Sequence, residues 1–148
     1  MKRERAVIDA SNIVYLESPR QPKPSIKYIF AVIAAVRASR REPLVIVDPT
    51  VLSVVGEPEQ LQKLLMESCV RTTPPGSDAA RVVLETARER DAIIVSNNTY
   101  VDYWNEYPWV ELCRLPVAAI DGSVCLLEAR FKDTDLESLA TRAASLHR

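Results

Sequence analysis

The sequence is poor in the residues on which several classes of protein depend. It has three glycines and a single histidine, His147, next to its last residue. Neither a G-x-G-x-x-G segment nor a P-loop is present, so a nucleotide-binding or phosphatase-like α/β domain is the weaker interpretation. A histidine in the tail cannot serve the centre of a histidine-dependent mechanism. The cysteines, Cys69, Cys113 and Cys125, form no C-x-x-C pair, which favours reduced, packed cysteines over a zinc site or a disulfide framework.

Excess charge and long apolar runs are also absent. The formal net charge of −1 gives no overall attraction for nucleic acid, although a local basic groove stays compatible with it. The longest apolar run, residues 28–36, is too short to cross a bilayer. The basic start of the chain leads into a polar segment rather than a secretory apolar region. We therefore expect a cytoplasmic protein that makes no membrane contact.

The stretch around which the chain is organised stands almost at its beginning. Residues 6–8 form an apolar triplet that is typical of a strand buried on both faces. The triplet ends at Asp9, and the small polar residues Ser11 and Asn12 follow, which favour turns and caps. In an open α/β sheet, ligands bind just beyond the carboxyl ends of parallel strands, so Asp9 is well placed to hold a metal or to orient a water.

The same pattern occurs a second time after an amphipathic helix. Residues 43–47 are a second apolar run, and Asp48 ends it. The segment 25–40 between the two runs has helical periodicity, with Ser25 as the expected cap. A strand, a helix and a strand in this order form a βαβ unit and a parallel sheet. Asp9 and Asp48 are therefore expected at the same edge of that sheet.

The remaining elements complete an α/β fold in one domain, residues 1–148. Asp121-Gly122 strongly indicates a two-residue hairpin turn. Further helices are predicted over 57–70, from Ser77 or Asp78 to 90, over 100–107 and over 133–146, and further strands over 70–73, 91–96, 115–120 and 123–129. The predicted fold class is α/β with a central, mainly parallel sheet and a C-terminal β-hairpin plus helix.

Four acidic residues fall at loop ends that this topology brings to one edge of the sheet: Asp9, Asp48, Asp78 and Asp102. A cluster of carboxylates is stabilised when a cation neutralises it, and oxygen ligands alone suit Mg²⁺ or Mn²⁺. Structural explanations stay open for three of them: a helix cap for Asp78, a solvated surface for Asp102 and a turn for Asp48. Asp9 has no such explanation in the sequence.

Three motifs in this order resemble a known family. Val7-Ile8-Asp9-Ala10-Ser11-Asn12 is similar to the opening motif of NYN-domain ribonucleases, and the resemblance is closest to their regnase-like branch. Pro75-Gly76-Ser77-Asp78 matches the family's helix start, and residues 95–102 match its V-V-S-N-D-x-x-x-D segment. The resemblance implies a PIN-like, three-layer sandwich in which helices flank a parallel sheet. It also implies an enzyme that cuts RNA endonucleolytically with Mg²⁺ or Mn²⁺.

The resemblance also implies residue roles. Asp9 and Asp78 correspond to metal ligands, bound directly or through water. Asp48 resembles the acid that parts of the PIN-like superfamily place after the second strand, and Asp102 corresponds to a further acidic, catalytic member. Asn98 is an additional candidate ligand through its amide oxygen. The expected supporting and substrate-binding residues are Ser11, Asn12, Ser96, Asn97, Tyr100, Lys23 and Lys27.

Two departures from the family pattern support an alternative. Ala79 stands where the regnase-like pattern has a second acid, and Asn98 stands where it has an aspartate. An amide brings no charge and cannot act as a base at neutral pH. The alternative is a degenerate, catalytically weak PIN-like module that binds RNA or a protein partner.

Aromatic and basic residues suggest how a partner would be held. The segment 100–109 contains five of the nine aromatic residues, and such rings commonly stack on the bases of single-stranded nucleic acid. Packing onto the sheet or a homodimer interface is the competing explanation, favoured for Trp104 and open for Tyr100. Arg20, Lys23 and Lys27 are candidate phosphate contacts, which a solvated surface explains equally well. The partner implied is RNA.

Overall fold

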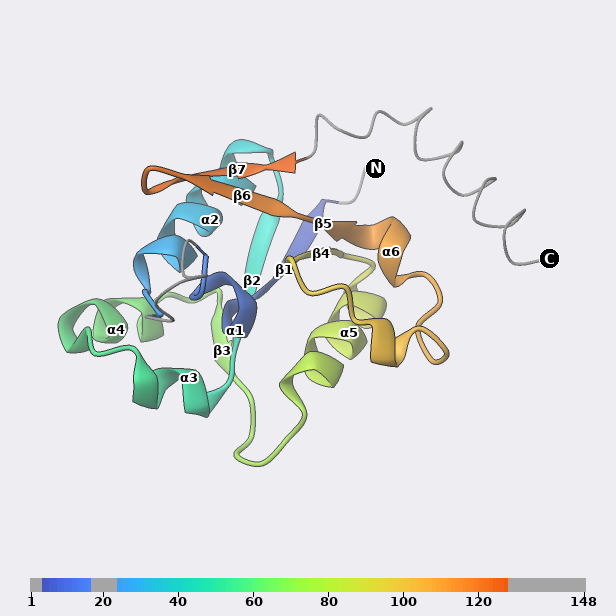
Figure 1. The fold of residues 1–148 in the computed structure, drawn as a ribbon, viewed down its shortest axis with the longest axis horizontal. Coiled ribbons are helices and arrows are strands. Elements are labelled where there is room, and N and C mark those ends of the chain that lie inside the picture. The colour runs from blue at the N-terminus through green and yellow to red at the C-terminus, as the bar shows by residue number, and fades with distance from the viewer. Residues whose placement is uncertain (1–3, 17–23, 128–148) are drawn as a thin grey trace.

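The architecture is a parallel sheet between two layers of helices (Figure 1). The structure, a computed structural model, describes residues 4–16 and 24–127. The strand order is β3-β2-β1-β4-β5, and every pair in this sheet is parallel. The strands are β1 (Arg5–Asp9), β2 (Glu42–Val47), β3 (Val70–Thr72), β4 (Ile93–Val95) and β5 (Arg114–Leu115). The predicted α/β class with a mainly parallel sheet is confirmed.

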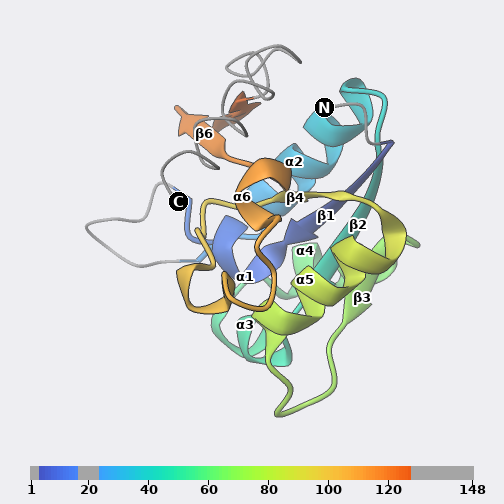
Figure 2. The same ribbon diagram turned by 90° about the vertical axis from the view of Figure 1, so that its right-hand side faces the viewer.

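The helices cover both faces of this sheet. They are α1 (Ala10–Ile13), α2 (Lys27–Ala38), α3 (Pro49–Val54), α4 (Pro58–Leu65), α5 (Ala79–Arg90), α6 (Val110–Cys113) and the 3-10 helix η1 (Val101–Tyr103). Figure 1 shows α2 and α5 on opposite sides of the strands, and Figure 2 shows α6 on the same side as α5. Among the described residues, no helix is both long and apolar enough to cross a bilayer.

The central strand β1 supplies both hydrophobic cores because its side chains alternate. Ala6 and Ile8 pack in one core with the buried face of α2, whereas Val7 packs in the other with α5. All three are completely buried. Full burial of an aliphatic side chain such as Val7 or Ile8 stabilises the fold by about 1.5–3 kcal/mol. This strand is therefore a rigid support for Asp9 at its end.

The predicted hairpin forms a separate two-stranded sheet of β6 (Val117–Ile120) and β7 (Ser123–Leu126). Asp121 and Gly122 both have positive φ, 51° and 81°, which a two-residue turn of this hand requires. The hairpin lies against the α2 side of the molecule (Figure 1). The sequence signal for this turn is confirmed.

Several boundaries differ from the sequence prediction. The second helix begins at Lys27, and Ser25 accepts only a 3.4 Å hydrogen bond from the Lys27 N–H instead of capping as its N-cap residue. The helix expected over 57–70 ends at Leu65, and the one expected over 100–107 shrinks to the three residues of η1. α1, α3 and α6 were not predicted, and the strand expected over 115–120 is divided between β5 and β6. The helix predicted over 133–146 lies outside the described residues.

Candidate functional site

Asp9 is the buried centre of the candidate site. It ends β1 at the carboxyl edge of the sheet, and its residue is 4% exposed. Ser96 follows β4, which pairs with β1, so the two residues lie side by side. The Ser96 hydroxyl donates to Asp9 Oδ2 at 3.4 Å, and the Tyr100 hydroxyl donates to the same oxygen at 2.5 Å. The sheet and the loop after β4 thus converge on one carboxylate.

The hydrogen-bond donors around the Asp9 carboxylate carry no charge. Burial raises the pKa of the Asp9 carboxyl, and hydrogen bonds from Tyr100, Ser96 and the backbone N–H groups of Asn12 and Ser11 offset part of that rise. Within the part of the chain that the structure describes, Asp9 is therefore a buried carboxylate to which no cationic side chain donates. A cation at this place would be stabilised electrostatically.

The loop after β4 holds Tyr100 in an unusual backbone conformation. Tyr100 has φ 55° and ψ 33°, the left-handed region that a bulky residue adopts only under constraint. The constraint is a chain of hydrogen bonds: the Asn98 N–H donates to Ser96 Oγ at 3.0 Å, and the Tyr100 N–H donates to Asn98 Oδ1 at 2.9 Å. This conformation points the phenol at Asp9.

Tyr100 is consequently not a stacking platform for a base. Its residue is 1% exposed and its hydroxyl donates to Asp9, so of the two explanations that the sequence left open, packing beside the site describes Tyr100. Tyr107 is equally buried, and its ring meets that of Trp109 edge-on at 5.9 Å between centroids. Trp104 keeps 40% exposure, while its Nε1–H donates to the Thr99 carbonyl at 2.9 Å. Trp104 is therefore an aromatic residue of this loop with a ring available to a partner.

Two asparagines connect the site to neighbouring elements. The Asn97 N–H donates to Asn12 Oδ1 at 2.8 Å, which joins the loop after β4 to α1. The Asn97 amide also forms a pair with the backbone of Val117: Nδ2 donates to its carbonyl and Oδ1 accepts from its N–H, both at 2.8 Å. These contacts give Asn12 and Asn97 positioning roles between the loop and the hairpin.

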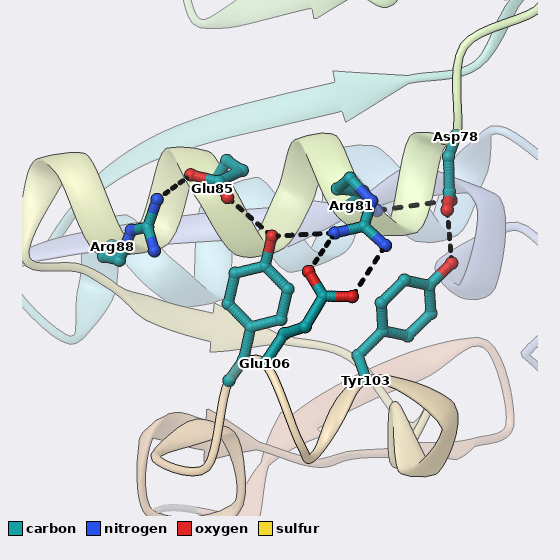
Figure 3. A network of polar contacts seen from close by, with 7 residues as sticks. Asp78, Arg81, Glu85, Arg88, Tyr103 and Glu106 are labelled. Atoms are coloured by element: carbon teal, nitrogen blue, oxygen red, sulfur yellow. Dashed lines mark hydrogen bonds and ion pairs between the residues drawn. The ribbon is translucent and has the colours of Figure 1, made fainter.

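Asp78 lies at the first turn of α5 and has two partners (Figure 3). One carboxylate oxygen caps the helix by accepting from the Arg81 N–H at 3.3 Å, as the structural interpretation of the sequence expected. The other accepts a hydrogen bond from the Tyr103 hydroxyl. This bond lowers the pKa of Asp78 and raises the pKa of Tyr103 to about 12. Asp78 is exposed and ionised at neutral pH.

Next to Asp78, Arg81 is the centre of a network that the sequence did not predict (Figure 3). Its guanidinium binds Glu106 with both terminal nitrogens, Nη1 to Oε2 at 2.5 Å and Nη2 to Oε1 at 3.1 Å. Nη1 also donates to the Tyr107 hydroxyl at 3.3 Å, and that hydroxyl donates to Glu85 at 2.6 Å. The ion pair is largely exposed and screened by solvent, so its main effect is to hold the segment that follows η1 against α5.

Of the other predicted residues, Ser11 contacts this centre through its backbone N–H, which donates to Asp9. Asp48 caps α3 by accepting from the Thr50 N–H at 3.0 Å, as its turn interpretation anticipated. Asp102 is exposed on η1, and the Lys27 ammonium lies 4.9 Å from the centroid of the Tyr28 ring. Ser11 is half-buried in α1. Lys23 and Arg20 lie outside the described residues.

The four predicted acids do not form one compact ligand cluster. Within residues 4–16 and 24–127, no group of three histidine, cysteine, aspartate or glutamate side chains is close enough together to hold a metal ion. The structure brings together Asp9, Ser96 and Tyr100, with Asn98 one hydrogen bond away. The oxygen donors there match the chemistry of Mg²⁺ and Mn²⁺, which commonly take only one or two protein carboxylates and complete their coordination with waters and substrate phosphates.

Comparison with known proteins gives one family and one fold. The family model described as the Zc3h12a-like Ribonuclease NYN domain matches residues 2–116. The crystal structure of nuclear proteinaceous RNase P 2 (PRORP2) from A. thaliana is similar, with a TM-score of 0.66 and 19% identity over 84% of this chain and 29% of that one. A second structure of Arabidopsis thaliana nuclear protein-only RNase P 2 gives a TM-score of 0.63 and 20% identity over 85% and 30% of the two chains.

The similarity to the two RNase P structures covers part of their length and is low in sequence identity. The chain spans less than a third of the length of the two RNase P structures that it resembles. At this level of identity, the likeness to them shows the fold. The search among curated proteins found no match.

Proposed function

The chain belongs to the family of Zc3h12a-like NYN ribonuclease domains, and we propose that it is a single-domain, metal-dependent endoribonuclease that hydrolyses phosphodiester bonds of single-stranded or structured RNA. The observation that carries the proposal is the buried carboxylate of Asp9, which ends β1 and accepts hydrogen bonds from neutral donors. A divalent cation is a partner that suits such a carboxylate.

In this proposal Asp9 and Asp78 hold Mg²⁺ or Mn²⁺, directly or through water, and Asp48 and Asn98 are the further candidate ligands. When bound, the ion supplies an activated water and neutralises charge on the phosphate. Asp9 is ready for this role because its side-chain hydrogen bonds to Ser96 and Tyr100 both end on Oδ2 and fix the plane of the carboxylate.

The remaining residues position the substrate and the acids. Tyr103 holds Asp78 by its hydroxyl, while Arg81 and Glu106 hold the segment that follows η1 against α5. Asp102 lies on the exposed side of η1, where it acts as a further acid beside the RNA. Trp104 offers a partly exposed ring on which a base can stack. The cytoplasm stays the predicted location, and RNA is the proposed partner.

The test of metal-dependent cleavage uses an end-labelled single-stranded RNA and the wild-type chain with Mn²⁺, Mg²⁺ or EDTA. Internal cuts that need the metal and stop with EDTA support the proposal. A metal-binding readout that does not require cleavage is the shift in melting temperature on adding Mn²⁺. Cleavage that continues unchanged in EDTA would overturn the metal-dependent mechanism.

A catalytically weak RNA-binding or protein-binding module is the second candidate. Ala79 begins α5, beside the capping Asp78, and Asn98 supplies an amide where the family pattern has an acid. The site consequently carries less negative charge than that pattern. The double variant Ala79→Asp/Asn98→Asp separates the two candidates: a large gain in Mn²⁺-dependent cleavage from a barely active wild type indicates the degenerate module, and a small change indicates that the natural site is complete.

A further inference from the structure

β1 and β2 begin at the edge of the sheet opposite Asp9. A cavity of about 330 Å³ opens there. Its walls come from the first residues of both strands, the segment leading into β3, and the ends of α2 and α5. The lining residues are Arg5, Ala6, Val7, Arg37, Arg41, Glu42, Pro43, Leu44, Ser68, Cys69, Arg71, Arg90 and Ala92.

Arginine dominates the charge of this cavity. Five of the nineteen basic residues of the chain line it, and Glu42 is the acidic residue among its described lining. This concentration occurs in a chain whose net charge is −1. The five arginines are Arg5, Arg37, Arg41, Arg71 and Arg90. Arg37 and Arg41 stand four residues apart at the end of α2, whereas Arg5, Arg71 and Arg90 come from β1, β3 and α5, so the fold brings basic residues of four segments together.

Helix ends explain only part of this charge. α2 ends at Ala38 and α5 at Arg90, and the carboxyl end of a helix carries about half a negative charge. Two such ends together offset about one guanidinium. Glu42 offsets another, and its Oε2 lies 4.0 Å from Arg5 Nε with both side chains more than half exposed. Arg41 is left out of this count because it has contacts of its own, and the other four arginines still leave an excess of positive charge among the described lining side chains.

The inner wall of the cavity is built from a buried arginine. Arg41 is 7% exposed, and its Nη1 donates to Ser39 Oγ at 3.3 Å. Beside it, Arg37 Nη2 lies 3.9 Å from the Cys69 sulfur, a neutral and weak acceptor. Arg71 and Arg90 are exposed at the mouth of the cavity. Positive side chains from separate segments thus surround one space.

We propose that this arginine pocket is a second binding site, separate from Asp9, for the phosphate group of a nucleotide or of an RNA strand. Guanidinium groups match phosphate oxygens in pairs, and several of them around one cavity favour a doubly charged or repeated anion. The two sites lie at opposite ends of the five-residue strand β1, about 13 Å apart along it. Phosphate bound in the arginine pocket therefore does not displace a ligand of Asp9.

The test measures binding in EDTA, so that its result does not depend on metal-dependent cleavage. The probes are sodium pyrophosphate, followed by the melting temperature, and a fluorescein-labelled single-stranded RNA, followed by anisotropy at several salt concentrations. The variant is Arg71→Gln/Arg90→Gln, because both side chains are exposed and their replacement leaves the cores intact. The matched control is Lys63→Gln/Arg88→Gln, which removes the same charge from exposed positions outside the pocket.

A rise in melting temperature with pyrophosphate that is absent in the pocket variant and present in the control indicates a free phosphate or nucleotide as the ligand. If only RNA binding changes, the ligand is the RNA backbone, and the slope of log K against log salt falls by about 0.7 for each phosphate that the variant no longer neutralises. Either result supports the proposal that the arginine pocket binds phosphate. Equal behaviour of the wild type and the two double variants towards both probes would overturn it.

Discussion

The Tyr100 hydroxyl donates a 2.5 Å hydrogen bond to Asp9 Oδ2, between two residues that lie 91 positions apart in the sequence. Both are buried, and Tyr100 reaches Asp9 through a left-handed backbone conformation with φ 55°. The bond joins the first strand to the loop after β4. The free energy of unfolding therefore depends on this bond and on the ionisation of Asp9, the proposed catalytic carboxylate.

Tyr100→Phe removes this donor and leaves Ser96 as a side-chain donor to Asp9 Oδ2. A buried acceptor that loses a partner costs about 1–3 kcal/mol, so we expect a fall of that size in the free energy of unfolding, measured with urea. Tyr15→Phe is the control, because Tyr15 is 43% exposed. Equal free energies for the wild type and Tyr100→Phe would contradict the assigned bond.

The pH dependence of stability reports on Asp9 itself. Folding raises the pKa of Asp9 above its usual value of 3.8, chiefly because burial disfavours the charged form. At pH values between the pKa of Asp9 in the unfolded chain and its higher pKa in the folded chain, Asp9 is protonated more often in the folded chain. Ionisation of Asp9 as the pH rises through this window therefore lowers the free energy of unfolding. In EDTA, Asp9→Asn removes that effect. We expect its stability relative to wild type to increase from about pH 4 upward, as measured by urea unfolding.

A relative stability of Asp9→Asn that does not change over this pH range would show that the Asp9 pKa is not raised. Asp78 must be kept in both the wild type and Asp9→Asn, because folding lowers the pKa of Asp78 whereas it raises the pKa of Asp9. The Tyr103 hydroxyl lowers the pKa of Asp78, so Asp78 contributes stability above its unfolded pKa and loses that contribution as pH falls through the folded pKa.

Substitutions of Asp78 separate its two proposed roles. Asp78→Asn keeps an oxygen that can cap α5, whereas Asp78→Ala removes the acceptor of the Arg81 N–H. Loss of the cap is expected to cost about 1 kcal/mol in Asp78→Ala and much less in Asp78→Asn. We expect both variants to lose metal-dependent cleavage, because both lose the charge. Full cleavage by a folded Asp78→Asn would leave Asp78 with the capping role alone.

Asn98→Asp adds a charge and keeps the acceptor that holds the loop. The Asn98 side chain accepts from the Tyr100 N–H through Oδ1, and a carboxylate can accept the same bond. We expect an unchanged melting temperature and a lower Mn²⁺ concentration for half-maximal cleavage, measured by metal titration. A fall in stability together with unchanged metal dependence would place Asn98 outside the metal site.

The sequence predicts best those features that depend on local patterns. The apolar run that ends at Asp9, the cap at Asp78 and the turn at Asp121-Gly122 are each visible within a few residues. Each is present in the structure, since strand burial, helix capping and positive φ have direct residue preferences. The motifs around Asp9, Asp78 and Ser96 likewise led to the correct family.

Features that depend on tertiary contacts were missed. β5 has two residues and forms only because β4 offers an edge with which it pairs. The sequence left Tyr100 open between stacking and packing, because nothing local shows that its backbone turns left-handed and buries the phenol beside Asp9. The pair of Arg81 with Glu106 spans 25 residues and follows no helical spacing. These contacts are set by packing, which a single sequence does not display.

The most direct test of the Asp9 site compares RNA cleavage by wild type, Asp9→Asn and Asp121→Asn in Mn²⁺. Asp121 lies exposed in the hairpin turn, so its variant makes the same chemical change away from the site, and asparagine tolerates its positive φ. We expect Asp121→Asn to cut like wild type, whereas Asp9→Asn melts cooperatively but cuts no RNA. Cleavage by Asp9→Asn at the wild-type rate would contradict the central claim that Asp9 is the core of a metal-dependent nuclease site.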